Sequence, residues 1–136
     1  MNRPPRYLLD TSIIIWVLRE RQEIIAIVER LHKEGEVYSS YICLAELFEG
    51  VRRVSNQTAA EQQLLELFAT FEALYGLDIP IAKQFGQIRA GLKASGKTIE
   101  DLDILIASTC LAYDLTLVTG NPKHFSRIPN LKVLAV

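Results

Sequence analysis

The stretch Tyr7-Leu8-Leu9-Asp10-Thr11-Ser12-Ile13-Ile14-Ile15-Trp16-Val17-Leu18 predicts a buried strand that ends at an acidic residue and turns directly into a helix. Its first three residues form an apolar run too short for a helix, and the apolar residues after Ser12 recur at helical spacing. Asp10 therefore lies at a strand end. In an open α/β sheet that end belongs to the carboxyl edge, where ligand-binding loops collect. Asp10 could instead serve only as a helix cap, because Asp accepts hydrogen bonds from free backbone amides.

Helices alternate with short apolar strands along the rest of the chain. The predicted helices after the first cover residues 22–33, 41–54, 57–73, 81–94 and 99–113, and the predicted strands cover residues 36–40, 74–79, 115–119 and 131–136. This alternation is typical of an α/β fold with a mostly parallel sheet, right-handed crossovers and helices on both faces. A chain of 136 residues fits a single domain, 1–136.

The composition is that of a globular protein without a strong charge. Hydrophobic residues make up 49% of the chain and the net charge is -1, so any polyanion must bind at a local patch or through a metal. Cys43 and Cys110 lie in apolar patterns without metal-ligand spacing, which favours reduced core residues and an intracellular, cytoplasmic location. No apolar run approaches the roughly 18 residues that span a bilayer, and the first six residues do not resemble a signal peptide.

Glu46 is a second acidic candidate for a functional site. It lies at the border of an apolar helical stripe and has no basic residue three or four positions downstream. Glu49, by contrast, has Arg52 and Arg53 at those positions and is readily explained as a helix ion-pair partner. A solvated surface glutamate remains the alternative for Glu46.

Asp103 and Asn121 complete the set of candidates. Thr98 and Asp101 fit a capping box, which would place Asp103 at the fifth position of a strongly apolar helix, beyond the turn where acidic residues are expected. Asn121 follows a predicted strand and precedes a proline, so it could be an ordinary turn residue. It also lies at a carboxyl strand end, as Asp10 does.

Together, Asp10, Glu46, Asp103 and Asn121 supply oxygen ligands without histidine or cysteine. Such a set suits magnesium or manganese and not zinc. Three carboxylates in one cleft would repel one another, and a divalent cation would relieve that repulsion. It could also polarise a phosphoryl oxygen and generate a hydroxide nucleophile.

Two further groups of residues give weaker signals. His32 and His124 are lone histidines without a base-nucleophile arrangement, so surface or packing roles are expected. Basic residues on helices and loops could be solvated faces or a discontinuous rim that contacts phosphates. These basic residues are Arg52, Arg53, Arg89, Lys93, Lys97, Lys123 and Arg127.

Four short motifs appear in a recognisable order: Asp10-Thr11-Ser12, Ser40-x-Ile42-x-x-x-Glu46-Leu47, Asp103-x-x-Ile106-Ala107, and Thr119-x-Asn121 followed by His124-Phe125. In this order the chain resembles the PIN-domain ribonucleases, specifically the VapC-type toxins of toxin-antitoxin pairs. The resemblance implies a three-layer α/β/α sandwich and hydrolysis of RNA at a site that depends on magnesium or manganese. It also implies that Asp10, Glu46 and Asp103 are the main acidic residues, with Asn121 at the fourth position.

The resemblance carries expectations about partners as well. It implies a homodimer and inhibition by a cognate antitoxin whose segment occupies the active-site groove, for which the apolar hairpin 42–74 is the expected contact. Cys43 stands where the family often has Thr or Ser. Asn121 and His124 stand where some members have acidic residues, so one metal ion is expected and not two.

Two other functions remain open from the sequence. A non-catalytic PIN-like module would bind RNA or a protein partner without metal-stimulated turnover. An aspartyl-phosphate phosphotransferase or haloacid-dehalogenase-like phosphatase also begins with an Asp at a strand end, but the second Asp expected at position 12 is a serine here.

Overall fold

The computed structural model describes residues 3–136, in which the central sheet consists of five strands. They are β1 (Arg6–Leu9), β2 (Glu36–Ser40), β3 (Leu74–Tyr75), β4 (Thr116–Thr119) and β5 (Val133–Ala135). All are parallel, in the spatial order β3-β2-β1-β4-β5. The predicted parallel sheet is therefore confirmed.

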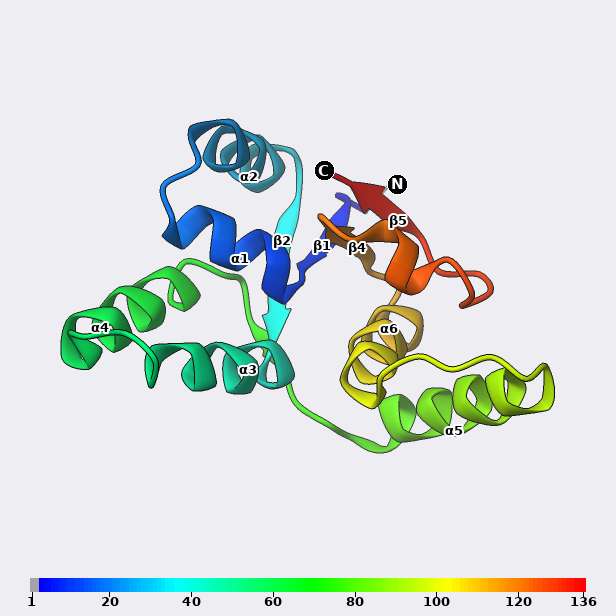
Figure 1. Cartoon of the computed structure of the whole chain (residues 1–136). Helices are drawn as coiled ribbons and strands as arrows, with labels where there is room; N and C mark the ends of the chain where they lie inside the picture. Colours follow the sequence, from blue (N-terminus) through cyan, green and yellow to red (C-terminus); the bar gives the residue numbers. More distant parts are fainter. Residues whose placement is uncertain (1–2) are drawn as a thin grey trace.

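Six helices and a short 3-10 helix surround the sheet in this part of the chain, residues 3–136. They are α1 (Thr11–Leu18), α2 (Gln22–Glu34), α3 (Tyr41–Val51), α4 (Gln57–Phe68), α5 (Ile79–Ala94), α6 (Asp101–Tyr113) and the 3-10 helix η1 (Pro122–Phe125). Figure 1 shows α1 to α4 on one side of the strands and α5 and α6 on the other. This is the three-layer α/β/α arrangement that the sequence predicted.

The strand order reverses between β1 and β4. From β1 the chain moves outward to β2 and β3, then crosses to β4 on the other side of β1 and continues to β5. At such a switch point the two connections leave the sheet in opposite directions, so a crevice opens outside the carboxyl ends of the strands. Asp10 lies at this point, and its backbone N–H donates to the Val118 carbonyl of β4 at 3.1 Å.

The β1–α1 unit forms the centre of the core. Leu8, Leu9, Ile13 and Ile14 are each at most 1% exposed, and Leu117 of the neighbouring strand is fully buried. Burying side chains of this size contributes about 1.5–3 kcal/mol each. The packed core therefore holds the start of α1 firmly in place.

Trp16 on α1 packs against Gly120, the residue after β4. A Cβ atom at position 120 would lie 2.1 Å from a carbon of the Trp16 ring, which is far inside contact distance. The Arg21 guanidinium covers the Trp16 ring, 4.5 Å from its centroid. Only glycine therefore lets the β4–η1 loop approach α1 this closely.

The segment after β3 differs from the prediction. The strand predicted over residues 74–79 has only two residues, and the Asp78 side chain caps α5 by accepting from the Ile81 N–H at 3.1 Å. Pro80 lies in the first turn of α5, where its missing N–H has no intrahelical partner to lose. Pro80 thus helps to begin a helix instead of ending a strand.

Several other boundaries were also wrong. The helix predicted over 57–73 ends at Phe68, and the one predicted over 41–54 ends at Val51, leaving Val54 45% exposed. The last helix begins at Asp101 after Glu100, so Thr98 is not its cap and Asp103 lies in its first turn. Within the described part of the chain, each helix is too short or too polar to cross a bilayer.

We expect Gly120→Ala to lower the free energy of unfolding by about 1–3 kcal/mol, because the added methyl group overlaps the Trp16 ring. The matched control is Gly86→Ala in the exposed middle of α5, where nothing lies within 4 Å of a new Cβ atom. That control should gain about 0.5–1 kcal/mol from helix propensity. Urea unfolding measures both, and equal effects at the two positions would contradict the close Trp16 contact.

Candidate active site

Asp10 lies at the centre of the site, between the end of β1 and the start of α1. Its side chain is buried, and Oδ1 accepts from the Ser12 hydroxyl at 2.5 Å and from the Ile13 N–H at 3.2 Å. Burial raises the pKa of Asp10, and hydrogen bonds from the side chains of Ser12 and Thr119 partly offset that rise. Asp10 does cap α1, as one alternative predicted, yet it also faces the crevice.

Ser12 connects the two loops that meet at the switch point. While its hydroxyl donates to Asp10, the same oxygen accepts from the Gly120 N–H at 3.0 Å. In the next turn of the loop, the Asn121 N–H donates to the Thr119 hydroxyl at 2.9 Å. These bonds join the β1–α1 turn to the β4–η1 loop, so the orientation of the Asp10 carboxylate depends on both.

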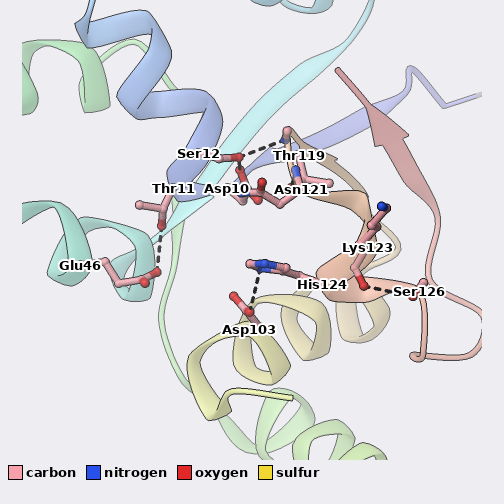
Figure 2. Close-up of polar contacts among 11 residues, drawn as sticks. Asp10, Thr11, Ser12, Glu46, Asp103, Thr119, Asn121, Lys123, His124 and Ser126 are labelled. Carbon is pink, nitrogen blue, oxygen red and sulfur yellow. Dashed lines mark hydrogen bonds and ion pairs between the residues drawn. The ribbon is translucent and has the colours of Figure 1, made fainter. Parts of the chain in front are cut away.

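Glu46 reaches the site from α3. Ser40 at the end of β2 caps this helix by accepting from the Cys43 N–H at 3.1 Å, as predicted, and Glu46 follows on the next turn. Its Oε1 accepts from the Thr11 hydroxyl at 2.8 Å (Figure 2). Burial raises the pKa of Glu46, and the negative charges of Asp103 and Asp10 raise it further.

Asp103 comes from the opposite layer, in the first turn of α6. Its Oδ2 lies 3.5 Å from Nδ1 of His124 on η1. Burial raises the pKa of Asp103, the nearby His124 lowers it, and the charges of Glu100 and Asp10 raise it again. Figure 2 shows Asp10, Glu46 and Asp103 on different sides of one space, with the His124 ring directed toward Asp103.

The structure therefore brings three of the predicted acidic residues to one edge of the sheet. Asn121 lies at the same edge, two residues beyond β4, and is exposed. His124, Ser12 and Thr11 were not singled out as site residues from the sequence. The sequence included them only as members of the short motifs, because the residues that they contact lie far away along the chain.

The donor set suits a hard divalent cation. Within residues 3–136, no three His, Cys, Asp or Glu side chains are close enough to hold one metal ion together. Magnesium, however, is commonly bound by one or two carboxylates and keeps several waters. Burial raises the pKa of Glu46 and of Asp103, and the charge of Asp10 raises both further, which marks an excess of negative charge that such an ion would neutralise. The carboxylates present therefore fit a hard divalent cation of this kind.

A groove of about 610 Å³ opens beside Asp103. One wall is the start of α6 and the loop before it, and the other is η1 and the loop after it. The lining residues are Thr98, Ile99, Glu100, Asp103, Lys123, His124, Ser126 and Arg127. The groove gives the acidic centre an open approach from solvent.

Comparisons with known proteins agree with this architecture. The PIN domain family model matches residues 7–131. The chain is 34% identical to Ribonuclease VapC2 of Rickettsia felis, covering 92% of this chain and 93% of the relative, and 32% identical to Ribonuclease VapC1 of Haemophilus influenzae, covering 93% and 94%.

The chain also superposes on solved structures over almost its whole length. VapBC2 from Rickettsia felis bound to a DNA fragment from its promoter superposes with a TM-score of 0.89 at 30% identity, covering 96% of this chain and 98% of that one. VapBC-1 from nontypeable Haemophilus influenzae superposes with a TM-score of 0.84 at 31% identity, covering 95% and 96%.

In the metal-free protein, we expect Asp10→Asn to raise the free energy of unfolding at pH 7. Because burial raises the pKa of Asp10, the folded state resists its ionisation. The wild-type protein therefore loses stability as the pH rises from the ordinary carboxyl pKa of about 4 through the raised value, whereas asparagine has no such dependence. Thermal unfolding in EDTA at pH 4 and pH 7 measures the difference.

The stability gap between Asp10→Asn and wild type should be larger at pH 7 than at pH 4. Asp101→Asn, which removes an exposed carboxylate paired with Arg89, is the control and should show no gain. An Asp10→Asn protein that is less stable than wild type at pH 7 would contradict the expected cost of burying this charge.

Proposed function

The chain belongs to the PIN-domain family, and we propose from this premise that it is an endoribonuclease that hydrolyses RNA phosphodiester bonds as the toxin of a toxin-antitoxin module. The observation that carries the proposal is the convergence of Asp10, Glu46 and Asp103 from three elements at the switch point of the sheet. The names of the relatives, Ribonuclease VapC1 and VapC2, support the same activity.

Hydrolysis of a phosphodiester requires a nucleophilic water and neutralisation of the charge that develops on the phosphoryl oxygens. A bound magnesium or manganese ion would supply that positive charge and increase the acidity of water. Asp10 and Asp103 would hold the ion. Glu46 would complete its ligand shell or orient the attacking water.

Neighbouring side chains position these carboxylates. The hydroxyl of Ser12 fixes the Asp10 carboxylate against α1, and the hydroxyl of Thr11 directs Glu46 toward the crevice. His124 faces Asp103 from η1, with its Nδ1 atom 3.5 Å from the carboxylate. Asn121, two residues beyond β4, offers an amide at the fourth position of the site.

The same family fold could instead serve as a non-catalytic module that binds RNA or protein. The observation in its favour is that, in the described part of the chain, no three acidic, histidine or cysteine side chains lie close enough to share an ion. Such a module predicts association with RNA but no turnover in magnesium or manganese.

We expect Asp10→Asn and Glu46→Gln each to reduce cleavage of a mixed RNA pool by about 100-fold or more, because each removes a carboxylate from the proposed centre. Glu49→Gln is the matched control for Glu46→Gln, since Glu49 lies on the same helix but forms an exposed ion pair with Arg53. Gel analysis of the RNA with magnesium, with manganese and with EDTA measures the activity.

Metal-dependent cutting that both variants lose and the control retains would support the nuclease. Full activity in Asp10→Asn would remove Asp10 from the mechanism. If the folded wild-type protein binds RNA but cuts none of the pool in either metal, the non-catalytic module is the better description.

A second surface suits the antitoxin. An apolar cavity of about 200 Å³ lies between α1 and the two helices α3 and α4 of the hairpin 42–74 that the sequence indicated. Its apolar lining consists of Ile15, Leu18, Leu47, Val51, Val54, Ala60 and Leu64. An apolar segment of the antitoxin would fill it. Homodimerisation, the other implied association, stays a prediction that the solution mass of the antitoxin-free protein tests.

We expect Val54→Asp to weaken antitoxin binding by about 10-fold or more, because it places a charge at the rim of this apolar cavity. Leu65→Asp is the matched control, since Leu65 is equally exposed at 45% but does not line the cavity. Titration calorimetry with the cognate antitoxin measures both affinities. Equal losses, or none, would place the antitoxin elsewhere.

A further inference from the structure

The structure separates the basic residues that the sequence offered as a phosphate-contacting rim. Arg53 pairs with Glu49, and Arg89 pairs with Asp101 at 3.0 Å. Because these two guanidinium groups already face carboxylates, they are poor candidates for binding a phosphate backbone.

Of the five other basic residues, Arg52 and Lys93 line neither of the two cavities described next, and the remaining three lie along one path. Lys123 and Arg127 line the groove of about 610 Å³ that begins at Asp103. Arg127 also lines a second cavity of about 270 Å³, and Lys97 is among the other residues of that cavity. We call Lys123, Arg127 and Lys97 the basic track. Within residues 3–136, none of the three forms an ion pair with a carboxylate.

The two walls of the groove carry opposite charges. Glu100 and Asp103 stand on the α6 wall, and Lys123 and Arg127 stand on the η1 wall. A polyanion entering the groove would be repelled by the first wall and attracted to the second. Its phosphates would therefore follow the basic track. They would approach Asp103 only at the acidic centre, where a bound cation can compensate the negative charges of the carboxylates and the phosphate.

The lining of the groove further restricts what it can bind. Among the described residues that line it, His124 has the only ring on which a base could stack. On the η1 wall, the Lys123 ammonium, the Arg127 guanidinium and the Ser126 hydroxyl are donors suited to phosphate oxygens. Within residues 3–136, Arg127 makes one long hydrogen bond, at 3.4 Å, to the Thr98 carbonyl, so most of its donors are not used there.

We propose that the basic track binds the sugar-phosphate backbone of single-stranded RNA beside the scissile bond, with Lys123 and Arg127 as the principal contacts and Lys97 as the outer one. This inference rests on the proposed ribonuclease function and deepens it. Contacts of this kind position the strand without reading its sequence. The track thus supplies a general affinity for RNA that the net charge of -1 does not suggest.

The test measures binding separately from cleavage. In an Asp10→Asn background and in EDTA, fluorescence anisotropy with two single-stranded RNAs of different sequence gives the affinity at several salt concentrations. We expect Lys123→Ala combined with Arg127→Gln to weaken both complexes by about tenfold or more at low salt. The slope of log K against log salt should fall by about 1.4, because each lost phosphate contact on a single strand removes about 0.7.

Lys33→Ala is the control, since Lys33 is an exposed cation at the end of α2 and lines neither cavity. It should leave the affinity and the slope unchanged. The single variant Lys97→Ala should give a smaller loss than the double variant, in keeping with its outer position.

An unchanged affinity and slope in the double variant would overturn the proposed basic track. The ribonuclease proposal would still stand in that case if Asp10→Asn abolishes cleavage. A second outcome is that the double variant loses RNA binding while the wild-type protein cuts no RNA. That result would support the basic track and refute the ribonuclease. If the double variant loses affinity for an Asp- and Glu-rich peptide but not for RNA, the groove binds protein and the proposal fails.

Discussion

A buried carboxylate at the carboxyl end of β1 is the constraint on which the rest of the site depends. Asp10 is only 5% exposed, so its charge must be compensated by groups that the fold supplies. The Ser12 hydroxyl and the Ile13 amide do so locally. The same hydroxyl accepts from Gly120, whose close approach to α1 is possible only because it lacks a side chain. The charge and the packing of the two loops therefore depend on each other.

Sheet topology explains why the other acidic residues meet Asp10. The helices that follow β2 and precede β4 lie in different layers, and both have an end at the carboxyl edge of the sheet. Glu46 therefore enters from α3 and Asp103 from α6, and burial together with the charge of Asp10 raises the pKa of both carboxyl groups. The η1 wall, with Lys123 and Arg127, balances part of this charge at a distance and leaves the centre itself acidic.

The active site and the apolar cavity between α1, α3 and α4 share two helices. On α1, Thr11 orients Glu46, and Ile15 lines the cavity one turn later. On α3, Glu46 faces the crevice, and the adjacent Leu47 lines the cavity. A partner that fills the cavity would thus contact the same helices that position the carboxylates.

The sequence by itself determined the local features: the strand that ends at Asp10, the Ser40 cap, the parallel α/β class and the acidic residues Glu46 and Asp103 as candidates. These follow from periodicity and capping, which are interactions between near neighbours in the chain. Tertiary structure alone decided that His124 faces Asp103 and that Ser12 bonds to Gly120, 108 residues away. Such contacts depend on strand order and helix packing, which bring together residues that no local spacing relates.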